Sequence, residues 1–181
     1  IDQLLPENAL YNIPLALTLR GSLNIWALEK ALNSLIQRHE SLRTIFVSSD
    51  NQATQVILPS LSLHLEECVL DLCELPQEQQ ASITQDYAQE EVSKPFNLSS
   101  GPLIRLKLIR LKEDEHLVLL TLHHIISDGW SMGVFFKELS HLYSAYVSNK
   151  EPTLPPLALQ YADFSIWQRK WLQGDVLDQQ L

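Results

Sequence analysis

The sequence predicts an α+β fold, in which helices flank a mixed, mostly antiparallel sheet. Three patterns predict it. Apolar residues alternate with other residues over 13–20, which is typical of a strand with one buried face. Residues 23–39 place their apolar side chains on one face of a helix. Residues 103–111 and 117–122 are two apolar runs joined by a charged turn, which indicates an antiparallel hairpin.

The elements follow one another without a repeat or a low-complexity segment. Gly21 and Ser22 end the first strand, and residues 38–46 close the first helix and open the next strand. We expect further strands at 53–58 and 61–70. Residues 76–92 are polar with a thin apolar stripe, which predicts a surface helix packed along one edge. Pro95 disfavours helical backbone at the residue before it, so this helix ends there.

The most informative stretch is residues 122–131. An apolar run ends in His123 and His124, and Asp128-Gly129 is a turn signal. A helix is expected after it, because large apolar residues recur at helical spacing from Met132 to Tyr146. Since side chains alternate along a strand, one histidine is expected to point into the protein and its neighbour toward a cleft. Asp128 lies near enough to pair with a cation or to orient an imidazole.

The C-terminal part contains a proline-rich connector at 151–156 and a last amphipathic helix that opens at Tyr161. Trp167 and Trp171 are four residues apart and lie on one helical face. Two tryptophans at this spacing are equally well explained as ordinary packing residues.

Composition excludes several classes of function. A chain of 181 residues with 45% hydrophobic and 19% charged residues is globular, with enough residues for one domain. The net charge of −9 argues against nucleic acid as a partner. There is no apolar run of the roughly 20 residues that a membrane span needs, and no signal sequence. Cys68 and Cys73 match no zinc pattern, and we expect no metal site but reduced thiols in a cytoplasmic protein.

Four motifs together resemble one family. His123-His124-x-x-x-Asp128-Gly129 resembles the HHxxxDG signature of chloramphenicol-acetyltransferase-like acyltransferases, and with Trp130-Ser131 it resembles a core motif of nonribosomal peptide synthetase condensation domains. Residues 38–46 resemble the motif RHExLRTxF of the same family, and residues 161–167 resemble YxDFxxW. Residues 95–105 also resemble the family, through the pattern Pro-Phe-x-Leu-x-x-Gly-Pro-Leu-x-Arg.

The resemblance implies a chloramphenicol-acetyltransferase-like lobe. A condensation domain has two such lobes with a tunnel between them, and residues 1–181 resemble the N-terminal lobe. By this comparison the first family motif lies upstream of Ile1 and the C-terminal lobe beyond Leu181. The implied partners are peptidyl and aminoacyl carrier proteins, adjacent synthetase domains and that second lobe, and the isolated lobe is expected to self-associate through the exposed face.

The resemblance also implies a reaction and its residues. The family forms an amide bond between two thioesters, each carried on the 4′-phosphopantetheine of a carrier protein, and the domain itself binds no cofactor. His124 is the implied catalytic residue, acting as a general base or by positioning the amine. His123 is expected to be structural, with its ring hydrogen-bonded inside the lobe, and Asp128 to be held by Arg43 or, alternatively, Arg38.

Five further residues complete the predicted site. Gly129 is expected to allow a tight turn and the close approach of the phosphopantetheine arm, and the helix after it to face an oxyanion. The residues expected to line the substrate channel are Trp130, Ser131, Tyr161 and Trp167.

Other functions remain open. One is a coenzyme A-dependent acyltransferase of the same superfamily, although residues 38–46 and 161–167 resemble the peptide-synthetase branch. Another is a lobe that is inactive alone and serves only for structure or binding. Met132 after Ser131 favours condensation over epimerization, and the two histidines exclude a heterocyclization domain. The Gly-Trp-Ser sequence resembles the type that accepts an L-configured donor. The amino acids joined are not specified by the sequence.

Overall fold

The computed structural model describes residues 8–49, 52–65 and 69–173. Four strands form one sheet in the order β1-β6-β5-β4, comprising β1 (Asn12–Arg20), β4 (Val69–Asp71), β5 (Ile104–Lys112) and β6 (Glu115–His123). β6 pairs antiparallel with both β1 and β5, and β4 pairs parallel with β5. The mixed, mostly antiparallel sheet and the β5–β6 hairpin are therefore confirmed.

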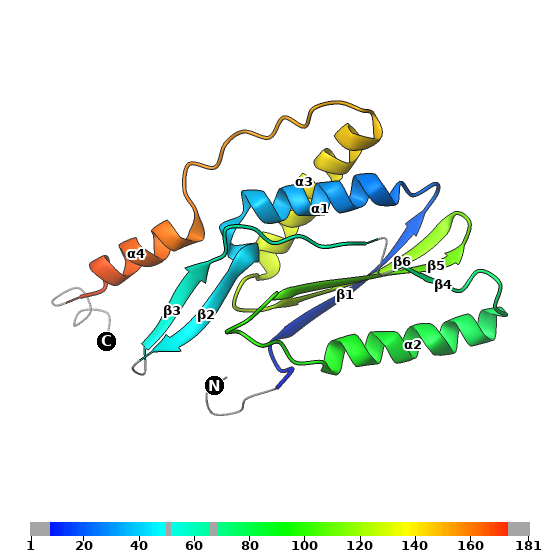
Figure 1. Ribbon diagram of the computed structural model, residues 1–181, viewed down its shortest axis with the longest axis horizontal. Coiled ribbons are helices and arrows are strands. Elements are labelled where there is room, and N and C mark those ends of the chain that lie inside the picture. Colours follow the sequence, from blue (N-terminus) through cyan, green and yellow to red (C-terminus); the bar gives the residue numbers. More distant parts are fainter. Residues whose placement is uncertain (1–7, 50–51, 66–68, 174–181) are drawn as a thin grey trace.

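Two helices cover one face of this sheet and a third covers the other (Figure 1). α1 (Ile25–Arg38) and α3 (Gly129–Val147) pack together on the first face. Their apolar side chains form the main core with the inward residues of β5 and β6, among them Leu32, Leu35, Leu108, Leu120 and Leu122. α1 begins at the cap that the Asn24 side chain provides by accepting a hydrogen bond from the Ala27 N–H.

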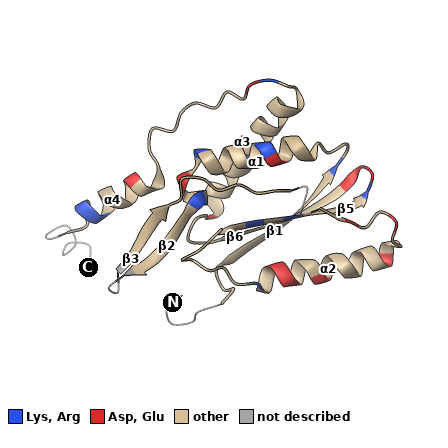
Figure 2. Cartoon of the chain, viewed as in Figure 1, with Lys and Arg blue, Asp and Glu red and all other residues tan. Residues whose placement is uncertain are grey.

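α2 (Gln77–Ser93) lies across the opposite face of the sheet, and not along an edge as the sequence suggested. Its apolar residues Ile83, Tyr87 and Ala88 pack on a small second core of Leu72, Ile109 and Leu119. The stripe is thin because the second core is small. Most other residues of α2 are exposed, and several acidic positions are coloured along its ribbon (Figure 2).

The strand expected at 61–70 is wrong for residues 61–65, which form no strand. Val69 and Leu70 belong to β4, and residues 66–68 lie outside the described residues. The Asn33 side chain of α1 accepts a hydrogen bond from the Leu63 N–H and donates one to the Leu63 carbonyl, and the Glu29 carboxylate accepts one from the Leu65 N–H. Side chains of α1 thus satisfy backbone groups that a sheet neighbour would otherwise bind.

The remaining elements lie beside the end of α1. A short 3₁₀ helix, η1 (Glu40–Arg43), leads from α1 into the hairpin of β2 (Thr44–Ser49) and β3 (Gln52–Ile57). α4 (Tyr161–Trp171) contacts η1 and has no fully buried residue. The predicted strand at 53–58 and the helix opening at Tyr161 are confirmed.

Candidate functional site

The histidine pair marks the end of β6. The His123 side chain is buried, whereas His124, the first residue of the following turn, is exposed. Backbone hydrogen bonds hold both residues in register: the His123 N–H donates to the Leu103 carbonyl at 3.0 Å, and the His124 N–H donates to the Tyr11 carbonyl at 2.8 Å. One histidine thus points inward and its neighbour outward, as strand alternation predicts.

The ring of His123 organises the turn. Its Nδ1 accepts a hydrogen bond from the Ile125 N–H at 3.1 Å, so in the neutral ring the proton lies on Nε2. The rings of Tyr11 and Phe96 lie against it, each with its centroid 6.0 Å away. The His123 carbonyl accepts from the Ile126 N–H, which tightens the turn further. The His123 ring is therefore buried and hydrogen-bonded, as expected.

Asp128 is the N-cap of α3. Its carboxylate accepts a hydrogen bond from the Ser131 N–H at 2.8 Å, and the Ser131 hydroxyl lies 2.7 Å from the Asp128 N–H, which donates to it. The hydrogen bond from the Ser131 backbone holds the pKa of Asp128 below its usual value, with smaller contributions from Trp130 and from the charge of His124. The Ser131 N–H at the start of α3 is therefore bound by Asp128, and an oxyanion role of this helix end stays a prediction.

The expected pairing of Asp128 with an arginine is wrong in this structure. Arg38 instead pairs with Glu138 of α3, with Nε 3.1 Å from Oε2, and donates to the Pro155 carbonyl. Arg43 pairs with Glu40 and donates to the Leu58 carbonyl. Asp128 already has partners in the helix cap, and the Glu138 side chain, which is 12% exposed, is a carboxylate whose desolvation the Arg38 cation offsets.

Glu138 also binds His39. Its Oε2 lies 2.7 Å from His39 Nε2, so neighbouring residues at the end of α1 share one carboxylate of α3. Burial raises the pKa of Glu138, but the hydrogen bonds and charges of His39 and Arg38 outweigh burial and leave this pKa below its usual value. Arg38 and His39, the first two residues of the RHExLRTxF pattern, thus link the end of α1 to α3.

Replacement of Asp128 distinguishes a cap from an ion pair. We expect Asp128→Asn to keep the thermal unfolding midpoint of the chain close to that of the wild type, and Asp128→Ala to lower it, because asparagine caps a helix about as well as aspartate and alanine does not. A large loss of stability in Asp128→Asn, comparable to that in Asp128→Ala, would contradict the cap and favour a charged partner.

Gly129 is not needed for the turn. Its backbone lies outside the left-handed region, since the glycines with positive φ among the described residues are Gly21 and Gly101. A Cβ at Gly129 would meet nothing within 4 Å. The predicted tight-turn role is therefore wrong, and the space next to the Gly129 backbone is open.

The expected channel residues occupy different positions. The Trp130 side chain is 86% exposed and borders a hollow of about 170 Å³ that His39, Ser127 and Ser131 also line. The Ser131 hydroxyl serves the helix cap. Tyr161 lies next to Ile125 and Ile126 of the histidine turn. Trp167 is farther along α4.

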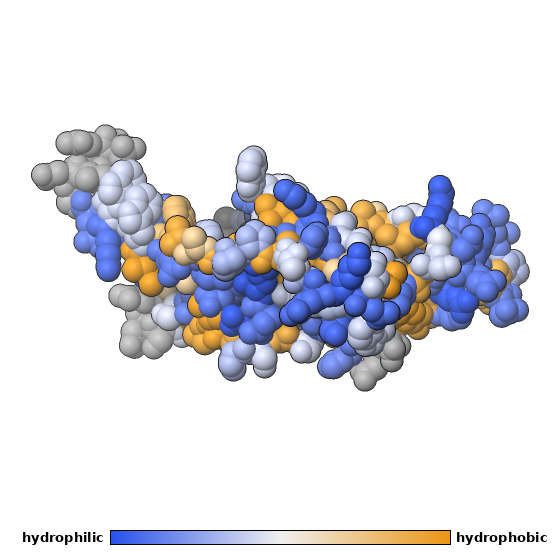
Figure 3. Space-filling model, turned by 90° about the horizontal axis from the view of Figure 1, so that it is seen from above, coloured by the Kyte–Doolittle hydropathy of each residue, from blue (hydrophilic) through white to orange (hydrophobic). Residues whose placement is uncertain are grey.

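The aromatic residues of α4 stack on one another. The rings of Tyr161, Phe164, Trp167 and Trp171 form successive contacts, and the last pair is parallel with centroids 5.4 Å apart. All four side chains are exposed, and Figure 3 shows hydrophobic surface next to α4 at the left of the view. Packing within the helix explains the spacing of the tryptophans in the described residues.

Sequence reasoning missed Tyr11 and Glu138. Glu138 lies on the apolar side of α3 within a helical pattern, and a buried acid there is the signal for a cation on a facing element. Tyr11 carries no comparable signal, because it touches His123 only through the pairing of β1 with β6.

Neither a metal cluster nor a membrane span is found in the described ranges. No group of three or more histidine, cysteine, aspartate or glutamate residues there has the arrangement of a metal site. No helix among the same residues is long and apolar enough to cross a membrane. Cys73 is a free thiol, and Cys68 lies outside the described residues.

Comparison with known proteins gives a consistent picture. A family model described as "Condensation domain" matches residues 1–181. A linear gramicidin synthase protein of Brevibacillus parabrevis is 48% identical over 180 residues, which is 99% of this chain but 2% of that protein. The chain thus spans a small fraction of the curated relatives it matches.

Two solved structures resemble the fold. The starter condensation domain of rhizomide synthetase RzmA has a TM-score of 0.82 and 25% identity, and the match covers 96% of this chain and 41% of that one. The X-domain in its complex with OxyB from teicoplanin biosynthesis has a TM-score of 0.77 and 33% identity, covering 91% of this chain and 34% of that one.

Proposed function

Because the chain belongs to the condensation-domain family, we propose that it forms the N-terminal, histidine-bearing part of a domain that makes amide bonds in nonribosomal peptide synthesis. A donor acyl or peptidyl thioester and an acceptor aminoacyl thioester are the substrates, each on the 4′-phosphopantetheine arm of a carrier protein. The observation that carries the proposal is the exposed His124 beside a buried, fixed His123 at the end of β6. The relatives and their names support it.

The proposed chemistry needs no nucleophile from the protein. The acceptor amine attacks the donor carbonyl, the C–N bond forms, the C–S bond breaks, and the donor arm leaves as a thiol after taking up one proton. A free α-amine has a pKa of about 7.7–8.0, so an appreciable fraction is neutral at cytoplasmic pH. His124 accepts a hydrogen bond from the amine, holds it in line, and removes the extra proton as the bond forms.

The other site residues act through position. We assign His123 to the turn that presents His124, and Asp128 to the start of α3. The open space at Gly129 admits the arm of a carrier protein, and Trp130 and Tyr161 border its path. The exposed aromatic residues of α4 favour contact with a further part of the domain, which we assign to the C-terminal lobe, and on that assignment residues 1–181 alone are inactive. The free thiol of Cys73 is in keeping with a cytoplasmic setting.

A direct assay tests this function. The complete synthetase module that contains the chain is mixed with one carrier protein bearing a donor thioester and another bearing an aminoacyl thioester. We expect the mass of the acceptor carrier to rise by the donor group, while the donor carrier returns to its free thiol. Hydrolysis of the donor without transfer would contradict condensation. Transfer from acyl-coenzyme A but not from the carrier would favour the stand-alone acyltransferase.

A binding module is the second candidate. It is favoured by the exposed aromatic surface of α4 and by the solved X-domain complex with OxyB. Under that reading the chain binds a carrier protein or another enzyme without turnover. Binding of the loaded carriers together with an absence of any amide product from the complete module would support it.

A further inference from the structure

The pattern at residues 95–105 has no role in the proposed chemistry, yet the structure brings its two ends together. Phe96 follows α2 and Arg105 lies in β5, and the Arg105 guanidinium carbon sits 3.8 Å from the centre of the Phe96 ring. This distance is typical of a cation stacked on an aromatic face. The Phe and the Arg of the pattern are therefore partners in a single contact.

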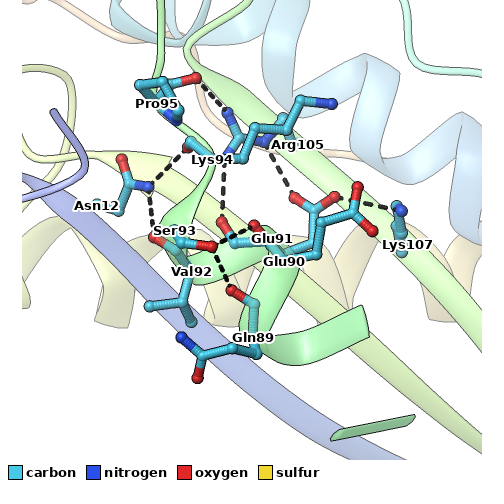
Figure 4. Close-up of polar contacts among 10 residues, drawn as sticks. All are labelled: Asn12, Gln89, Glu90, Glu91, Val92, Ser93, Lys94, Pro95, Arg105 and Lys107. Carbon is cyan, nitrogen blue, oxygen red and sulfur yellow. Dashed lines mark hydrogen bonds and ion pairs between the residues drawn. The ribbon is translucent and has the colours of Figure 1, made fainter. Parts of the chain in front are cut away.

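Arg105 is held in place by the C-terminal end of α2. Its Nε lies 3.0 Å from Glu91 Oε2, and its other nitrogens donate to the carbonyls of Glu91, Lys94 and Pro95 (Figure 4). The Glu91 side chain is 5% exposed and also pairs with Lys107. A cation at this end of a helix satisfies carbonyls that lack a helical partner. The guanidinium plane has little freedom to turn.

The same helix end is tied to the strand next to the histidines. Asn12 Nδ2 donates to the carbonyls of Val92 and Lys94, both at 2.9 Å, and Asn12 is the cross-strand partner of His123 in the β1–β6 pair. Phe96 then contacts the His123 ring edge to face, with an angle of 90° between the rings. A continuous series of contacts leads from Glu91 through Arg105 and Phe96 to His123.

We infer that Glu91, Arg105 and Phe96 are positioning residues, which hold the His123 ring in one orientation and so set the turn that carries His124. The hydrogen bond from the Ile125 N–H to His123 Nδ1 survives only if the ring keeps this orientation and this tautomer. Rotation of the ring releases the backbone directly after His124. The consequence for catalysis rests on the proposed function, but the control of the ring does not.

The inference is tested by NMR on the 181-residue chain with ¹⁵N-labelled histidine. Long-range ¹H–¹⁵N correlations at about pH 8, above the usual histidine pKa, report which ring nitrogen of His123 carries the proton. In the wild type we expect one set of signals, with Nδ1 as the unprotonated acceptor and Nε2 protonated. In Phe96→Leu and Arg105→Gln we expect both ring nitrogens to move toward averaged values and the Ile125 amide signal to shift.

Two variants separate positioning from general stability. Arg110→Gln is the matched control. Arg110 lies on the same strand as Arg105 and forms an ion pair with Asp71, which the variant removes, but it is not part of the contact series. We expect it to leave the His123 signals unchanged. Arg105→Lys keeps the charge opposite Glu91 without the flat stack on Phe96, and we expect it to restore the ring signals only in part.

Unchanged His123 ring signals in a folded Phe96→Leu chain would overturn the inference, because that variant leaves the ion pair intact and removes only the aromatic contact. If Arg105→Gln does not fold, the His123 ring signals of Phe96→Leu and Arg105→Lys test the inference instead. These readouts do not depend on turnover. An inactive synthetase with the expected ring signals would refute the proposed function alone, and an active one with unchanged signals would refute this inference alone.

Discussion

We expect replacement of His124 with alanine to lower the proposed amide-bond formation by the complete module about 10²–10⁴-fold, the range that a positioned acid–base group contributes. We expect the thermal unfolding midpoint to change little, because the side chain is exposed and the backbone contact with the Tyr11 carbonyl is retained. The rate is measured as transfer of the donor group to the acceptor carrier, followed by mass spectrometry at saturating concentrations of both carriers.

The matched control is His141→Ala, which removes another exposed histidine from α3. We expect turnover close to that of the wild type.

The pH dependence then separates two roles of His124. If the histidine mainly deprotonates the amine, the defect of His124→Ala shrinks as the pH rises through the amine pKa of about 7.7–8.0. If it mainly positions the amine and removes the late proton, the defect persists above that pH. Near-normal turnover of His124→Ala would remove His124 from the mechanism.

Local patterns predict the frame of the site well. The apolar run before His123, the Asp-Gly turn and the spaced apolar residues after it each act on near neighbours, so strand, turn and helix follow from the sequence. The opposite directions of His123 and His124 follow from the same local geometry. The helix that ends before Pro95 is equally local.

The sequence-based predictions were wrong where they concerned contacts between residues far apart in the sequence. Nothing in the spacing of Arg38 indicates whether Asp128 or Glu138 faces it, since both acids lie about a hundred positions away. Asp128 is the N-cap of α3, and the packing of α3 against α1 brings Glu138 next to Arg38. The expected strand was wrong at 61–65 for the same reason, because the side chains that bind this backbone, Asn33 and Glu29, belong to α1 and lie 30 and 36 residues away in the sequence from their partners.

Glu138 illustrates how much stability such a distant contact carries. Glu138→Ala leaves Arg38 and His39 beside a void, with side chains only 16% and 22% exposed. Removing one partner of a buried ion pair typically costs about 3–5 kcal/mol, and we expect the lower end because Arg38 keeps its hydrogen bond to the Pro155 carbonyl. Urea unfolding of the 181-residue chain measures the loss, and Glu90→Ala, which removes an exposed carboxylate from α2, is the control.

The contribution of Glu138 also depends on pH, with a defined sign. Its folded-state pKa is lower than its usual value of 4.5, so the folded state favours the charged carboxylate more than the unfolded state does. The stabilisation is fully present above the unfolded-state pKa and is lost as the pH falls through the lower folded-state value. The gap in unfolding free energy between the wild type and Glu138→Gln therefore narrows from about pH 6 to about pH 3. A gap that stays constant or widens over this range would mean that the charge of Glu138 is not what joins α3 to the end of α1, and that the contact acts through packing alone.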